Sequence, residues 1–333
     1  MKARLLVSFA AAVVAGSSLS AQTPDPQCPS GTAAQRISQD ACQKAIDLFR
    51  YLAPQLGTSI AGGNATLGQG GNLGGLGHFS AGIRVNAVQG SLPQAQNIQI
   101  STSGASRTTP IDTKSQYFPM PTADLAIGVF KGLPLALTNV GGVDLIVSAS
   151  YVPQFDNSGV SVKVPNGSLK LGYGARVGIL QESLLVPGVA VSYLVRDLPT
   201  LNIAGANGGD SLYVNNLSLK TKAWRVTASK SLILFGLAAG VGQDKYDAAT
   251  DISAHVAARP LLSPAANAGP VSISQNLTRT NIFADLSMNL LLFKLNAEIG
   301  QVSGGTINTY NTFSGKQAAD SRIYGSVGAR FGF

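Results

Sequence analysis

The chain has 333 residues, of which only 12% are charged, against about 25% in an ordinary soluble domain. Glycine is frequent, with 38 residues, and 45% of all residues are hydrophobic. So little charge beside so much apolar content excludes a solvated, disordered chain. Beyond the N-terminus no apolar run is long enough to cross a bilayer as a helix, which excludes a helical membrane protein.

The N-terminal segment, residues 1–21, has the layout of a secretory signal peptide. Lys2 and Arg4 precede an apolar stretch at 5–16, and small residues follow at 17–21. Such a leader is removed on export and does not contribute to the fold. The sequence therefore predicts an exported protein.

Two cysteines and a helical pattern open the mature chain. Export exposes the protein to oxidising conditions, so we expect Cys28 and Cys42 to form a disulfide. Apolar residues at helical spacing predict an amphipathic helix over about 32–52. Pro54 is expected to end this helix. A glycine-rich connector then completes an N-terminal region of residues 22–76.

From residue 77 to residue 333, apolar and polar residues alternate with the period of β-strands. In the last segment, Ile323, Val327 and Phe331 share one face. Ten strands are expected, at 77–90, 122–131, 142–153, 168–181, 186–197, 212–229, 231–246, 273–290, 292–303 and 321–333. The phase of the sixth strand is irregular near Trp224, which suggests a bulge there.

The charged residues fall on the polar faces of these strands, where they are candidates for lining the lumen of a barrel. The candidates are Arg84, Asp144, Lys170, Arg176, Asp285, Lys294, Glu298, Arg322 and Arg330. Arg196 shares this placement, whereas Lys131 and Arg225 fall on the apolar face. The lining charges either select solutes or form a structural network, and a narrow barrel favours the network.

The connections distinguish a barrel from a soluble sandwich. Tight turns near 182 and 291 alternate with long loops at 91–121 and 247–272, as in barrels of the outer membrane. An even strand number returns the C-terminus to the side of the N-terminus. The predicted fold is therefore all-β: a transmembrane antiparallel barrel of about ten strands, with 12 or 14 as alternatives, preceded by one amphipathic helix.

The chain ends on Phe333, with Phe331 on the same face of the last strand. This ending resembles the C-terminal assembly signal of bacterial outer-membrane β-barrels. The resemblance implies the Gram-negative outer membrane, recognition by the barrel-assembly machinery, and contact with lipid and lipopolysaccharide. The stretch from Tyr51 to Phe79 also resembles an uncharacterised family of outer-membrane barrels. The basic residues are scattered, which does not indicate a nucleic-acid partner.

A helix before the barrel is similar in architecture to the outer-membrane long-chain fatty-acid transporters, which carry an N-terminal lumen plug. The resemblance implies passive uptake or binding of a small apolar or amphipathic solute. The helix is expected either inside the lumen as a plug or across the periplasmic mouth of the barrel. The alternative function is a structural or adhesive barrel that acts through its long loops.

A third interpretation rests on His78 and Ser80, which project side by side on the first predicted strand. Their spacing resembles the His-x-Ser arrangement of outer-membrane phospholipase A and implies a membrane-embedded hydrolase. Both side chains are expected to face the lumen, whereas a lipid-cleaving site must face the membrane, so we do not expect an enzyme. His78 and His255 come with no cluster of metal ligands, and neither a metal nor a cofactor is expected.

Overall fold

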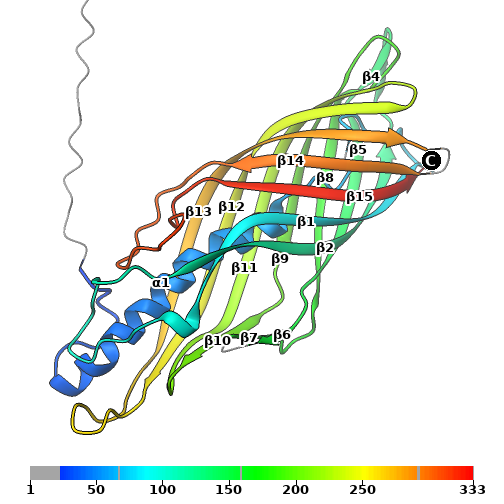
Figure 1. Ribbon diagram of the computed structural model, residues 1–333. Helices are drawn as coiled ribbons and strands as arrows, with labels where there is room; N and C mark the ends of the chain where they lie inside the picture. The colour runs from blue at the N-terminus through cyan, green and yellow to red at the C-terminus, as the bar shows by residue number, and fades with distance from the viewer. Residues whose placement is uncertain (1–22, 67, 158–159, 291–292, 333) are drawn as a thin grey trace, which may run out of the picture.

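The computed structural model describes residues 23–66, 68–157, 160–290 and 293–332. The predicted signal peptide and Phe333 lie outside the described residues. Within them, ten strands close into an antiparallel ring (Figure 1), which confirms the predicted fold and strand number. The ring strands are β1 (Phe79–Pro93), β2 (Thr113–Phe130), β5 (Gly142–Tyr151), β8 (Leu169–Leu180), β9 (Gly188–Asp197), β11 (Asp210–Ser231), β12 (Phe235–Val256), β13 (Ala266–Asn289), β14 (Lys294–Val302) and β15 (Arg322–Gly332).

The ring closes where the last strand pairs with the first. β15 runs antiparallel to β1, with Val327 opposite Val85 and Arg330 opposite Gly82. Each ring strand therefore has a hydrogen-bonded neighbour on both sides. Closure pairs the backbone N–H and C=O groups of neighbouring strands with one another. Strands need this pairing in a bilayer, because lipid cannot form hydrogen bonds with them.

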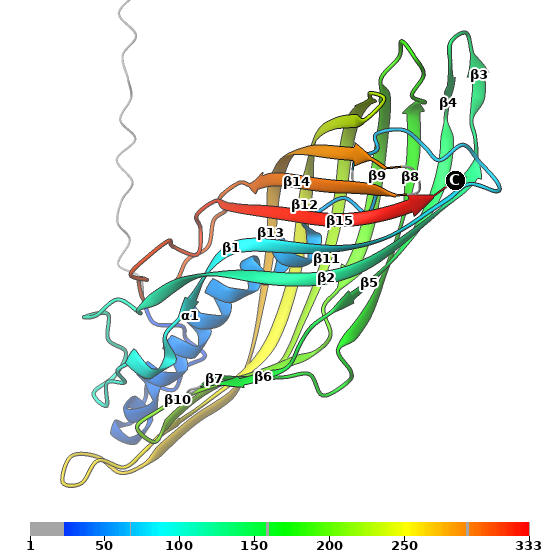
Figure 2. The same cartoon turned by 45° about the vertical axis from the view of Figure 1, so that its right-hand side comes forward.

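The two ends of the barrel differ (Figures 1 and 2). The turn end carries the C-terminus and four hairpin connections: β2 to β5, β8 to β9, β11 to β12 and β13 to β14. In the first of these connections, β3 (Leu133–Leu135) pairs with β4 (Thr138–Val140). The opposite end, here the loop end, carries the connections β1 to β2, β5 to β8, β9 to β11, β12 to β13 and β14 to β15.

At the loop end the wall extends further than the sequence pattern predicts. β6 (Phe155–Asn157), β7 (Val160–Lys163) and β10 (Leu201–Asn207) form a sheet extension that joins β11. The prediction of a loop over 247–272 is wrong, because β12 continues to Val256 and β13 begins at Ala266. The predicted loop at 91–121 likewise shortens, because β2 begins at Thr113; the 3-10 helix η1 (Ala95–Asn97) lies in what remains.

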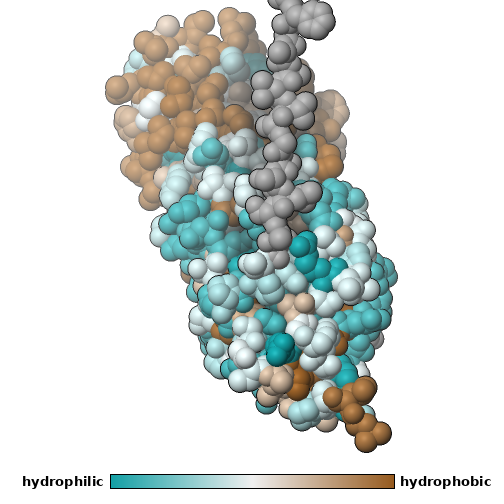
Figure 3. Space-filling model, turned by 90° about the vertical axis from the view of Figure 1, so that its left-hand side faces the viewer, coloured by the Kyte–Doolittle hydropathy of each residue, from teal (hydrophilic) through white to brown (hydrophobic). Residues whose placement is uncertain are grey.

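Part-way along the long strands, the apolar residues change from the inner face to the outer face, and the polar residues change in the opposite direction. On β13 the outward residues change from polar at the loop end (Ser272, Ser274, Asn276, Thr278 and Thr280) to apolar at the turn end (Ile282, Ala284, Leu286 and Met288). The inner face changes in the opposite sense, from Val271, Ile273 and Leu277 to Arg279, Asn281, Asp285 and Ser287. The turn half is thus built like a membrane barrel, and the loop half is built like a water-soluble domain. Figure 3 shows apolar side chains gathered over the turn end.

This exchange explains the irregular phase of β11. Arg225 was predicted on the apolar outer face, but it is buried inside the ring, while Trp224 faces outward. Leu217 and Leu219 also lie inside, at the loop end. A single apolar face therefore cannot be followed along the whole strand. The irregularity in pairing lies between Asn215 and Ser218, not near Trp224.

The helix α1 (Ala33–Ala61) lies inside the ring, packed against β11, β12 and β13 on one side and β1, β2 and β15 on the other. Thr32 caps its N-terminus in a capping box with Gln35. Pro54 lies buried within the helix, so the expectation that it ends the helix is wrong. Packing on all sides outweighs the one hydrogen bond that proline cannot donate. Within the described residues, no helix combines the length and the apolar character needed to cross a bilayer.

Candidate functional site

An apolar cavity of about 330 Å³ lies at the loop end, between α1 and the wall. Leu48, Leu52 and Leu56 line it from the helix, and their spacing of four residues places them on one stripe. The wall lines it with Tyr117 and Met120 of β2, Val162 of β7, Ile203 of β10, and Leu212 and Val214 of β11. Few polar groups line this cavity, so it suits a small apolar or amphipathic molecule.

The sheet is interrupted beside this cavity. β2 pairs with β5 only from Thr122 onward, so its loop-end stretch pairs with β1 alone in the described structure. Pro119 and Pro121 lie on this stretch and lack the N–H group that a further strand would need. Residues on both sides of the interruption, in β2 and in β7, line the cavity. The cavity therefore lies at a place where the wall has an unpaired edge.

Beneath the cavity, the helix ends on a layer of buried basic and amide groups. Arg225 Nη2 donates to the carbonyl of Ala61 at 2.6 Å, and Arg196 Nη1 donates to Ile60 and Ala61 at 3.3 and 3.4 Å. Asn86 Nδ2 donates to the carbonyl of Ser59 at 2.6 Å. These donors satisfy carbonyls that a helix C-terminus leaves free, and the positive charges complement its dipole. The helix ends where the interior changes from apolar to charged.

Residues 62–66 and 68–77, here called the strap, follow α1 and lead through the turn half of the lumen towards β1. The wall binds the strap through side chains of several strands. Arg84 Nη1 donates to the carbonyl of Gly62 at 2.9 Å, and Arg330 Nη1 donates to Gln69 Oε1 at 2.7 Å. Most strap residues are buried. The strap therefore fills the space that an open pore would need.

Acidic side chains take part in the same network. The amide of Asn64 donates to Glu298 Oε2 at 3.0 Å, and that of Leu73 donates to Asp144 Oδ1 at 3.0 Å. The glycines of the strap allow close approach: a Cβ at Gly70 would lie 2.6 Å from the amide nitrogen of Ser229. The polar interior is thus bound to the strap on several sides.

Buried ion pairs complete the interior of the turn half. Arg84 Nε lies 2.6 Å from Asp124 Oδ2, Arg176 Nη2 lies 2.7 Å from Asp144 Oδ2, and Arg225 Nη2 lies 3.2 Å from Asp244 Oδ1. Asp124 and Asp244 were not among the predicted lumen residues. Both lie on the inner face of the ring, as most of the predicted residues do, and alternation from Thr122 places Asp124 there directly.

The nine predicted lumen residues differ in their burial. Seven are buried inside the ring: Arg84, Asp144, Arg176, Asp285, Glu298, Arg322 and Arg330. Lys294 is half-buried, opposite Arg330 near the turn end. Lys170 is exposed, although it lies opposite the buried Ser150 near the loop end.

The helix also organises the loops above the cavity. Asp47 Oδ2 accepts from the amide nitrogens of Asn311, and Asp47 Oδ1 accepts from the amide of Tyr310 at 3.0 Å. Burial raises the pKa of Asp47 above its usual range, against the opposing effect of these hydrogen bonds. Asp40 accepts from the amides of Ser101 and Ser106 at 2.7 and 2.8 Å. The loops at 94–112 and 303–321 are therefore fixed to α1.

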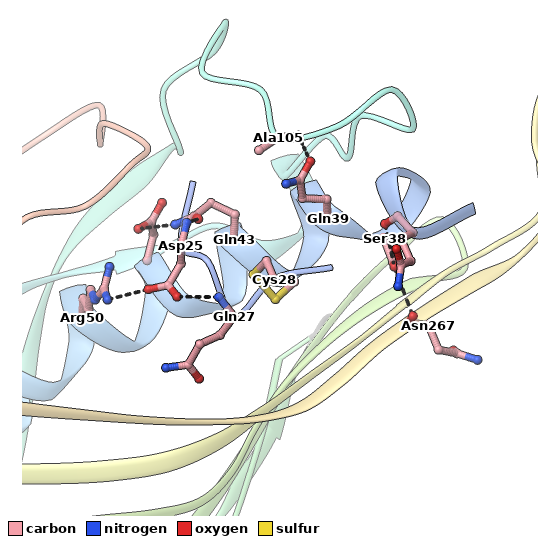
Figure 4. Close-up of a disulfide and its surroundings, with 12 residues drawn as sticks. Asp25, Gln27, Cys28, Ser38, Gln39, Gln43, Arg50, Ala105 and Asn267 are labelled. Carbon is pink, nitrogen blue, oxygen red and sulfur yellow. Dashed lines mark hydrogen bonds and ion pairs between the residues drawn. A yellow bond between two sulfur atoms is a disulfide. The ribbon is translucent and has the colours of Figure 1, made fainter. Parts of the chain in front are cut away.

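The predicted disulfide is confirmed: Cys28 and Cys42 are bonded at 2.04 Å (Figure 4). It joins the segment before the helix to the first turns of α1. Close to it, Arg50 Nη2 lies 2.8 Å from Asp25 Oδ2, and Gln43 accepts from the amide of Asp25. The N-terminal segment is thereby held against the helix at the loop end.

The His78 and Ser80 pair is not assembled as a catalytic unit. His78 is exposed before β1 begins, whereas Ser80 is buried within it. No hydrogen bond between their side chains is present among the described residues. In the structure described, no third residue orients the imidazole.

The chain matches no family model, and no curated protein matches it. Among solved structures it is similar to Ail, the attachment invasion locus protein of Yersinia pestis, at 12% identity over 78% of this chain and 99% of Ail, with a TM-score of 0.20. It is also similar to the Pseudomonas putida toluene transporter TodX, at 8% identity over 77% of this chain and 88% of TodX, with a TM-score of 0.26. The outer membrane protein OmpT of Vibrio cholerae matches at 8% identity over 77% of this chain and 96% of OmpT, with a TM-score of 0.20. None of these matches determines a function.

The architecture defines the class. A closed antiparallel ring, apolar outside and polar inside over its turn half, is the construction of an outer-membrane β-barrel protein. Within that class, this chain has a lumen occupied by its own helix and strap.

Proposed function

We propose that the protein resides in the Gram-negative outer membrane and takes up or binds a small apolar or amphipathic solute in the loop-end cavity. It reaches the membrane through a cleaved signal peptide and the barrel-assembly machinery, and contacts lipid and lipopolysaccharide there. It acts without catalysis, cofactor or metal. The observation that carries this proposal is the leucine stripe of α1 facing an apolar wall.

Two features of the structure support a route for the solute that does not pass through a water-filled pore. Among the described residues, the strap and the buried ion pairs occupy the turn half of the lumen. The cavity instead lies beside the unpaired edge of β2, so an apolar solute has a route through the side of the wall. An apolar molecule gains free energy by moving from water into such a cavity.

The test is binding of a fluorescent fatty-acid analogue to the purified protein in detergent. Replacing Leu52→Asn puts an amide that lacks partners into the cavity, at a cost of about 1–3 kcal/mol. We expect the Kd to rise roughly 5- to 150-fold. Leu261→Asn is the matched control, because Leu261 is fully exposed in a loop outside the cavity. Equal affinity of both variants would contradict the proposal.

A further inference from the structure

The four hairpins at the turn end carry exposed leucine and isoleucine side chains at their tips. The tip residues are Leu133, Leu135, Leu137, Leu184, Leu185, Leu232, Ile233, Leu234 and Leu290. Ile233 is 95% exposed and Leu184 is 91% exposed. Residues 132–141, 183–188 and 231–235 contain no charged residue. Turns that face water normally carry polar residues, so these tips have the wrong chemistry for an aqueous surface.

The apolar belt differs in height around the wall: on β8 the outward apolar residues run from Leu169 to Ile179, whereas on β13 the belt is short without the tips. On β13 the outward apolar run extends only from Ile282 to Met288. At about 3.4 Å per residue and the usual tilt of about 45°, that run spans roughly 15 Å of membrane depth. The apolar band of such barrels is about 25 Å tall. The neighbouring tips, which continue the apolar surface over the turn end (Figure 3), supply the missing depth.

Four backbone carbonyls at two of the tips accept hydrogen bonds from side chains of the protein. Asn289 Nδ2 donates to the carbonyls of Leu232 and Ile233 at 3.2 and 3.4 Å. Lys230 Nζ donates to the carbonyls of Ser183 and Leu184, so its charge is engaged beside the tip of the neighbouring hairpin. Water would solvate such carbonyls without help, whereas hydrocarbon would not. Carbonyls at the tips therefore need hydrogen-bond donors from the protein if the tips are surrounded by hydrocarbon, and these side chains supply such donors.

We propose that the turn end is seated within the bilayer, with the hairpin tips at 132–141, 183–188 and 231–235 and the side chain of Leu290 in contact with lipid acyl chains. The tips anchor the barrel and set its depth, and the β3–β4 hairpin lies among the acyl chains with its three leucines. This inference rests on the membrane placement in the proposed function. It goes beyond that placement because it states that lipid acyl chains, and not water, surround the tips.

Depth-dependent fluorescence quenching tests this assignment. Trp224 is the single tryptophan, so Trp224→Phe provides a silent background for one tryptophan at a time. Ile233→Trp and Leu184→Trp report on the tips; Leu286→Trp reports on the belt of β13. Asn276→Trp, on the same outward face of β13 at the loop end, is the aqueous control. Each variant is refolded into phosphatidylcholine vesicles with brominated acyl chains, and its folding is checked by heat-modifiable electrophoresis.

We expect tryptophan at both tips to be quenched by brominated lipid as strongly as at position 286 and to be shielded from aqueous iodide. Asn276→Trp should show the reverse. The inference would be overturned if iodide, and not brominated lipid, quenched the tryptophans at the tips while brominated lipid still quenched Leu286→Trp. That result would leave the membrane placement of the barrel standing. An unquenched Leu286→Trp would overturn the membrane placement itself.

Discussion

Arg225 joins the helix, the strand and the acidic interior in one residue. It donates to the carbonyl of Ala61, pairs with Asp244, and lies with its guanidinium carbon 5.6 Å from the centroid of the Phe283 ring. A buried charge of this kind requires all its partners, because desolvation must be offset by pairing. Together with Arg196 and Asn86, Arg225 therefore holds the end of α1 against the wall.

Replacing Arg225→Ala should destabilise the protein by about 3–5 kcal/mol, because Asp244 is then left buried and without its cation. The free energy of unfolding, from denaturant titration in micelles, measures this loss. Lys222→Ala is the matched control on the same strand, since the Lys222–Asp247 pair is exposed and contributes about 0–1 kcal/mol. A loss no larger than the control would show that the buried pair does not hold the helix.

At the scale of single elements, the outer face of β13 requires apolar residues at the turn end, where we expect lipid, and polar residues at the loop end, where we expect water. Leu286→Arg places a charge in the apolar belt and should cost about 2–4 kcal/mol. Asn276→Arg, on the same strand and the same outward face, lies in the polar half and should cost almost nothing. The stabilities of both variants in vesicles check this. Equal losses would mean that the exchange of chemistry along β13 does not mark a membrane boundary.

The helix is a second element whose attachment can be tested. The disulfide closes a loop with a sequence separation of 14 residues. Cys28→Ser with Cys42→Ser should therefore lower the stability by about 2–4 kcal/mol, chiefly by freeing the unfolded chain. Thermal unfolding with and without reductant measures the effect, and reductant should change only the parent protein. A reductant-insensitive parent would show that the crosslink does not stabilise the fold.

Local alternation was enough to predict the ten strands, because the inward and outward faces differ strongly over the turn half. It could not place Arg225 or the loop-end stretches of β12 and β13, since the same face there changes from facing lipid to facing water. Pro54 was misread for a related reason: helix propensity is local, whereas the packing that keeps the helix intact comes from strands distant in sequence. The cavity is wholly a product of tertiary structure: Leu48 and Leu52 fell on the apolar stripe of the predicted helix, but Leu56 lay beyond its predicted end at Pro54.

At the scale of the whole molecule, the occupied lumen predicts a barrel that does not conduct ions. The full-length protein should show no steady ion conductance in a planar bilayer, because the strap and its partners occupy the turn half. Removing residues 22–61 should produce measurable conductance, since the support of the strap is then lost. Circular dichroism and heat-modifiable electrophoresis show whether the shortened chain still forms a barrel. Equal conductance of both proteins would contradict the plugged arrangement.

The position of α1 and the strap has a consequence for biogenesis. Both precede β1 in the chain, yet both lie within the circle that β15 completes against β1. If the ring closed first, a helix about 10 Å across would have to pass through the closed barrel from the turn end. We therefore expect the helix and the strap to be in place before β15 pairs with β1, so that the first-made residues are enclosed by the last strand.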